Sequence, residues 1–84
     1  MKPNQIAFVY NRAIAFFQTK NYNSALEDLT KTIEAYPTFG EAFYFRAQCF
    51  MNLQRKEEAS ADFKRAEELG YAPANSDPDK KAAS

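Results

Sequence analysis

The amino-acid sequence predicts an all-α fold of four helices, arranged as two antiparallel hairpins. The main observation is an internal repeat: the segment VYNRAIAFF at residues 9–17 returns as FYFRAQCFM at residues 43–51. A second observation is that apolar residues recur at helical spacing in each copy, with short polar stretches between the periodic segments. The spacing from residue 9 to residue 43 is the repeat period. A fixed period of this length indicates a stack of repeated supersecondary units, here one helical hairpin per repeat.

The repeat extends over both helices of each hairpin. Within the opening segment, Arg12 aligns with Arg46 and Ala13 with Ala47. At the same offset, the pairs further along the chain are Ala25 and Ala59, Asp28 and Asp62, Leu29 and Phe63, Lys31 and Arg65, and Glu34 and Glu68. The repeating unit is therefore the whole hairpin and not a single helix.

Composition limits the classes of function that the chain can serve. Its 84 residues allow one small domain with a thin core, and its 11 basic residues balance its 11 acidic ones. This balance gives no reason to expect nucleic acid or an anionic membrane as a partner. No apolar run approaches the roughly 20 residues that span a bilayer, so no membrane insertion is expected. We expect a soluble protein, and its lone thiol slightly favours a reducing compartment such as the cytoplasm.

The first hairpin is expected to begin with a helix over residues 6–19, where apolar residues recur at helical spacing. After a short break, the side chain of Asn21 or Asn23 is expected to cap a second helix over residues 23–35. Pro37 cannot continue that helix and disfavours helical geometry in the residue before it. The loop between the two helices is short, so they are predicted to be antiparallel.

The second hairpin is expected to begin with a helix from Gly40 or Glu41 to about Leu53. A polar turn then leads to a fourth helix over residues 57–69, whose first turn carries acidic residues as the helix dipole favours. Gly70 is placed as the C-terminal cap of this helix.

Two hairpins with this period resemble the tetratricopeptide repeat family, over residues 6–39 and 40–73. Small residues stand where the two helices of such a repeat cross, namely Ala13, Ala25, Ala47 and Ala59. Large residues stand at other signature positions, namely Phe16, Tyr22, Leu29, Phe50 and Phe63. Pro37 matches the proline that closes a repeat, whereas Lys56 and Tyr71 depart from the family pattern in the second copy. The resemblance implies a short right-handed solenoid.

The two ends of the chain are expected to lie outside the repeats. Pro3 stands one repeat period before Pro37, so residues 1–5 are interpreted as a lead-in that ends a preceding repeat; the alternative is a proline that only marks a helix start, where this residue is common. The chain is thus expected to be a fragment of a longer array. Residues 74–84 lack apolar periodicity and are interpreted as a disordered tail or linker.

An arginine precedes an aspartate by the same spacing in both repeats, as Arg12 and Asp28 and as Arg46 and Asp62. In an antiparallel hairpin, residues at this spacing lie at the same height on facing helices. One hypothesis makes the arginines anion-binding residues. The favoured one makes each an ion pair across its own hairpin, because packing repeats with the fold more often than function does.

No residue pattern supports catalysis. The chain has no histidine, so the usual zinc sites and histidine-based acid–base chemistry are absent. Cys49 is expected to be buried and inert, since no histidine is present to stabilise a thiolate. The adjacent glutamates at 57–58 and 67–68 point in different directions on a helix and are interpreted as solvated. We therefore expect no enzyme, no metal and no cofactor.

The resemblance implies a concave groove lined by the first helix of each hairpin. Carrying the family's groove positions onto this chain gives as binding candidates Tyr10, Asn11, Ile14, Phe17, Gln18, Tyr44, Phe45, Gln48, Met51 and Asn52. Ala7 and the charged Glu41 complete the set. Some family members grip a terminal carboxylate in this groove, but only Asn11 fits such a clamp. The groove suits a protein or peptide segment with apolar anchors, whose backbone the amides would meet.

Two alternatives to a peptide-binding adaptor stay open. The first helix has no preceding neighbour and the last has no following one, so apolar flanks are expected on both. Copies of the chain could bury these flanks against each other and form homo-oligomers. The chain could also be a targeting or regulatory appendage of an enzyme encoded elsewhere in a longer parent protein.

Overall fold

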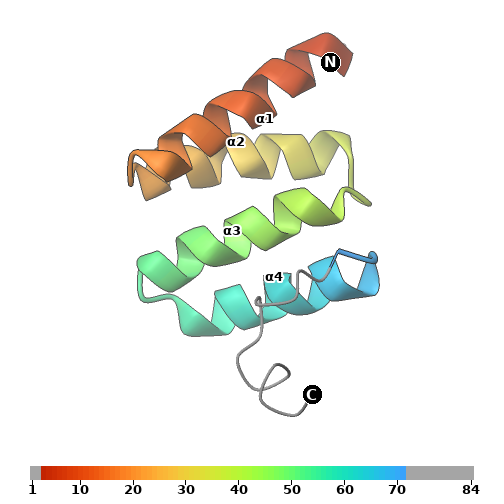
Figure 1. Ribbon diagram of the computed structural model, residues 1–84. Coiled ribbons are helices and arrows are strands. Elements are labelled where there is room, and N and C mark those ends of the chain that lie inside the picture. Colours follow the sequence, from red (N-terminus) through yellow and green to blue (C-terminus); the bar gives the residue numbers. More distant parts are fainter. Residues whose placement is uncertain (1–2, 72–84) are drawn as a thin grey trace.

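The computed structural model describes residues 3–71 as four helices: α1 (Pro3–Gln18), α2 (Tyr22–Ala35), α3 (Gly40–Asn52) and α4 (Lys56–Glu68). No strand occurs in these residues, and the predicted all-α fold of helical hairpins is confirmed. Figure 1 shows the helices side by side in chain order, each antiparallel to the next. The hairpins α1–α2 and α3–α4 stack chiefly through α2 and α3. The expected tail at residues 74–84 lies outside the described residues.

Two helix starts differ from the predictions for physical reasons. α1 begins at Pro3 and not at Ile6. Proline is favoured at the first helical position, because a backbone N–H at that position would have no acceptor within the helix. α2 begins at Tyr22, and the predicted side-chain cap is wrong, since no side chain caps this helix. The amide Nδ2 of Asn21 instead donates to Oγ1 of Thr19 at 2.8 Å. The remaining boundaries agree with the predictions within one residue.

Both hairpins turn through a residue with left-handed backbone geometry. Lys20 and Gln54, which stand one repeat period apart, have φ angles of 67° and 66°. In each turn the next backbone N–H donates at 2.8 Å to the carbonyl oxygen five positions earlier. Gly70, with φ of 90°, allows the same arrangement after α4, which confirms its predicted role as a cap. The left-handed region favours glycine, so the side chains at the two hairpin turns carry a conformational cost.

Small residues allow the helices of each hairpin to approach closely. The alanines predicted at the helix crossings are fully buried, namely Ala13, Ala25, Ala47 and Ala59. Leu29 and Phe43 fill the core around them. Gly40 brings the start of α3 against the end of the second hairpin, because a Cβ atom there would lie 3.0 Å from Cβ of Tyr71. The core therefore depends on close backbone approach at a few fixed positions.

The two ends of the stack differ in polarity. Phe8 on α1 is 64% exposed, whereas Ala42, its counterpart in the second repeat on α3, is fully buried. The apolar flank predicted for α1 is therefore present. On α4 the exposed side chains are polar or charged apart from that of Ala61, so the apolar flank predicted there is reduced to Leu69, which follows the helix and is 38% exposed. Glu67, for example, stands on α4 where α2 has the buried Ile33.

Replacing Lys20 or Gln54 by glycine should stabilise the fold by about 1 kcal/mol, because glycine adopts the left-handed conformation without steric cost. Urea denaturation of each variant measures the change. The matched control is Lys31→Gly, at an exposed position within α2, which should lose about 1 kcal/mol. A loss of stability in both turn variants would contradict the left-handed geometry.

Candidate functional site

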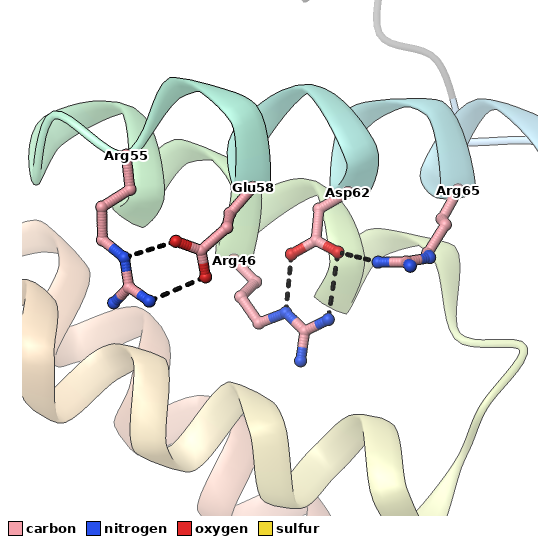
Figure 2. Close-up of polar contacts among 5 residues, drawn as sticks. All are labelled: Arg46, Arg55, Glu58, Asp62 and Arg65. Carbon is pink, nitrogen blue, oxygen red and sulfur yellow. Dashed lines mark hydrogen bonds and ion pairs between the residues drawn. The ribbon is translucent and has the colours of Figure 1, made fainter.

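One arginine–aspartate pair cross-links each hairpin. Arg12 on α1 donates through Nε and Nη2 to the carboxylate of Asp28 on α2, at 2.7 and 2.9 Å. Arg46 on α3 donates in the same way to Asp62 on α4, at 2.6 and 3.0 Å. Figure 2 shows the second guanidinium facing the carboxylate across the hairpin. The predicted ion pairs are confirmed, and their bidentate geometry favours one register of the two helices.

The second pair is the more buried of the two and belongs to a larger network. Asp62 also accepts a hydrogen bond from Nη1 of Arg65 at 2.9 Å (Figure 2). The side chain of Arg46 is 16% exposed, against 45% for Arg12, and its guanidinium carbon lies 5.4 and 5.9 Å from two phenylalanine ring centroids. Hydrogen bonding to Asp28 raises the pKa of Arg12 above its usual value. Both arginines are engaged within their own hairpins, which supports a structural role.

Asp62→Asn should destabilise the fold by about 2 kcal/mol, because it leaves two guanidinium groups without their carboxylate. Asp28→Asn should cost less, since the guanidinium of Arg12 can still be solvated. Urea denaturation measures both changes. Glu58→Gln is the matched control, because its pair with Arg55 is 48% exposed on both sides and should contribute little. Equal effects of Asp62→Asn and Glu58→Gln would overturn the structural role of the buried pair.

A row of aromatic rings connects α1 to α3. Phe17 on α1 packs edge-on against Phe45 on α3, with ring centroids 5.5 Å apart. Phe45 packs against Tyr44 at 5.4 Å, and Tyr44 packs against Tyr71 at 5.3 Å. Tyr22, at the start of α2, extends the row through a contact of 5.8 Å with Phe17. We call these five residues the aromatic row.

The ten predicted binding residues all lie on α1 and α3, and we call the surface to which they contribute the α1/α3 face. Six of them are half-buried, namely Tyr10, Ile14, Phe17, Tyr44, Phe45 and Gln48. Four are exposed, namely Asn11, Gln18, Met51 and Asn52. None of the ten is fully buried, so each has surface that a partner can contact.

The structure joins only some of these residues to one another. Ring contacts bring Phe17, Tyr44 and Phe45 together, and Gln48 Nε2 donates to the Tyr44 hydroxyl at 2.8 Å. Asn52 Nδ2 donates to the carbonyl oxygen of Gln48, also at 2.8 Å, so two of the four amides are used within α3. The exposed side chains of Asn11 and Gln18 make no hydrogen bond within residues 3–71.

A second cluster on this face was not predicted. The hydroxyl of Tyr10 on α1 donates a hydrogen bond to the carboxylate of Glu41, 31 residues away in the first turn of α3. The ring of Tyr10 packs against Phe39, with centroids 4.9 Å apart. Burial, and then the bond to Glu41, raises the pKa of Tyr10 far above its usual value, so this phenol stays protonated. Tyr71 also belongs here, because its pKa is raised by burial and by the nearby charge of Glu41.

Residues 3–71 were also examined for metal-binding groups, for a reactive thiol and for membrane-spanning helices. Residues 3–71 contain no group of three or more side chains that could hold a metal ion. Cys49 is fully buried, and burial raises the pKa of its thiol to about 11, so it stays protonated at neutral pH. None of the helices in this part of the chain is long and apolar enough to cross a membrane.

Three proteins of known sequence resemble the chain over most of its length. It is 34% identical over 59 residues to a DnaJ homolog subfamily C member 7 homolog of Dictyostelium discoideum, covering 70% of this chain and 11% of that protein. It is 33% identical over 67 residues to serine/threonine-protein phosphatase T of Trypanosoma brucei brucei, covering 80% and 14%. It is 30% identical over 71 residues to a DnaJ protein P58IPK homolog of Arabidopsis thaliana, covering 84% and 15%.

The chain therefore spans only about a tenth to a seventh of the length of these relatives. No solved structure gives a significant match. The family model of the tetratricopeptide repeat matches residues 40–69, which hold α3 and α4. The first hairpin repeats the second at a constant offset, with the same ion pair and the same turn geometry. The chain thus belongs to the tetratricopeptide repeat family, whose repeats are non-catalytic protein-interaction motifs.

Proposed function

We propose that the chain is an adaptor module that binds a protein or peptide segment on the α1/α3 face. The observation that carries this proposal is the combination of half-buried aromatic rings and exposed amides on that face. Met51 adds an apolar side chain that is 44% exposed. Large apolar side chains of this kind, surrounded by polar groups, are typical anchors for a peptide partner. The exposed part of α4 is polar by comparison.

The pattern of repetition also supports this role. Residues that hold the hairpins together are kept between the copies, as Arg12 with Arg46 and Ala13 with Ala47 illustrate. On the α1/α3 face the copies differ, since Asn11 aligns with Phe45, Ile14 with Gln48 and Phe17 with Met51. A surface whose two halves differ suits an asymmetric ligand bound in one direction.

The residues that we propose as anchors for the partner are not equally suited to a test. They are Tyr10, Phe17, Tyr44, Phe45 and Met51. Tyr44 packs against Phe45, Phe63 and Tyr71, so its truncation would disturb packing as well as the surface. Met51 is the most exposed of the proposed anchors, and its side chain makes no hydrogen bond or ring contact within residues 3–71. Its truncation therefore separates binding from folding.

The chain is also proposed to act as part of a longer protein. The relatives it matches are several times longer. In this proposal residues 6–39 and 40–73 are two repeats of a longer array. What the whole protein does would then depend on segments outside these two repeats.

Met51→Ala should weaken the binding of peptides to the α1/α3 face by about 1 kcal/mol or more, with little change in the stability of the fold. Peptides selected from a random phage-displayed library on the immobilised chain provide the ligands, and titration calorimetry measures their affinities. Phe8→Ala is the matched control: an exposed apolar residue on α1 at a position outside the α1/α3 face, whose loss should leave the affinities within twofold. Failure to select any peptide, or equal weakening by both variants, would count against the proposal.

Self-association through α1 is a second candidate function. The exposure of Phe8 favours it, and the Arg12 guanidinium lies 5.6 Å from its ring centroid, so the patch combines an apolar and a charged group. Head-to-tail stacking is disfavoured because α4 presents polar side chains. A two-fold contact between the α1 helices of two copies would bury the same patch on each.

Phe8→Ser should abolish this association, because a hydroxyl replaces the ring at the centre of the contact. Light scattering over a dilution series should show the molar mass of the wild type approaching that of a dimer, and that of the variant staying monomeric. Met51→Ala should behave like the wild type in the same assay. A monomeric wild type at every concentration rules out this candidate.

A further inference from the structure

We infer that the segment bound on the α1/α3 face carries a lysine or arginine side chain that pairs with Glu41. This inference rests on the proposed function and adds the chemistry of the partner to it. Its basis is a half-buried glutamate that forms no ion pair within residues 3–71 and accepts a hydrogen bond from Tyr10, whose ring packs against Phe39.

Glu41 has no ionic partner among residues 3–71. The four arginines of the chain pair elsewhere, Arg12 with Asp28, Arg46 and Arg65 with Asp62, and Arg55 with Glu58. No lysine in the described range forms an ion pair with Glu41. The one hydrogen-bond partner of its side chain is the hydroxyl of Tyr10, which binds a single carboxylate oxygen. The second oxygen is left to accept from a ligand.

The two tyrosines near Glu41 carry no positive charge that could neutralise it. Burial and the carboxylate raise the pKa of Tyr10, and burial also raises the pKa of Tyr71, so both phenols remain uncharged. The ring of Tyr10, whose hydroxyl binds the carboxylate, packs against Phe39, and the ring of Tyr71 packs against Tyr44. Aromatic faces attract cations and pack against the aliphatic stem of a lysine or arginine. An acidic segment would instead meet a like charge with no compensating group.

The position of Glu41 in the first turn of α3 also has a local explanation, because a helix N-terminus favours negative charge. Glu57 on α4 occupies a first turn in the same way but is exposed. The two glutamates differ in their tertiary contacts, because Glu41 is half-buried and accepts a hydrogen bond from a tyrosine of the other hairpin. Glu57 is therefore the matched control for a carboxylate that serves its helix alone.

The test uses the random phage-displayed library on the immobilised wild-type chain. Selected peptides should be enriched in lysine or arginine next to apolar residues. The basic residue of a selected peptide is then replaced by norleucine, which keeps the aliphatic stem, or by glutamate. Titration calorimetry measures the affinity of each peptide for the wild type, for Glu41→Gln and for Glu57→Gln. In Glu41→Gln the side-chain amide oxygen can still accept the hydrogen bond from Tyr10, so the fold is expected to be retained; a melting curve of the variant tests this.

Glu41→Gln should lower the affinity for the basic peptide roughly tenfold and leave the affinity for the norleucine peptide within about twofold of the wild-type value. Glu57→Gln should change neither affinity. Of the three peptides, the one with glutamate should bind the wild-type chain most weakly. Equal effects on the basic and norleucine peptides, or selected peptides without basic enrichment, would overturn the inference. In both of those cases Met51→Ala still decides whether the face binds peptides. If no peptide is selected, the inference fails together with the proposed function.

Discussion

The arginine–aspartate pair that bridges the two helices of each hairpin is the interaction on which the rest of the structure depends. It lies beside the alanine contacts that let the helices approach, and its bidentate geometry favours one register. Helices as short as these are at best marginally stable alone in water, so this register organises the whole fold. Both guanidinium groups are paired within their own hairpins, and the only charged side chain among the predicted lining residues of the α1/α3 face is that of Glu41.

The fold was predictable because every important spacing occurs twice. The repeat period indicated the hairpins, and the constant spacing from arginine to aspartate indicated their cross-links. The side-chain cap expected at Asn21 was wrong because the turn is decided by backbone geometry, with Lys20 in the left-handed region. The polarity of α4 could have been recognised in the sequence, since Glu67 aligns with Ile33, but which positions of α4 are exposed becomes evident only in the structure.

The candidate site was predictable in outline and not in its contacts. The resemblance to a family identified positions on the first helix of each hairpin, and none of the ten binding candidates is fully buried. Spacing could not reveal the bond between Tyr10 and Glu41, because it joins two hairpins across 31 residues. In the sequence, Tyr71 is recognisable only as a departure from the family pattern, whereas in the structure its ring extends the aromatic row. These contacts depend on how the hairpins stack, which a local pattern does not specify.

We divide the molecule into an internally paired scaffold and one proposed binding face. An amide chemical-shift map of the isotope-labelled chain, recorded while a selected peptide is added, tests this division most directly. The account predicts that the shifted amides cluster on α1 and α3, around Tyr10, Glu41 and Met51, and that those on the polar side of α4 stay unchanged. Shifts concentrated on α4 or around Phe8, with the α1/α3 face unaffected, would contradict it.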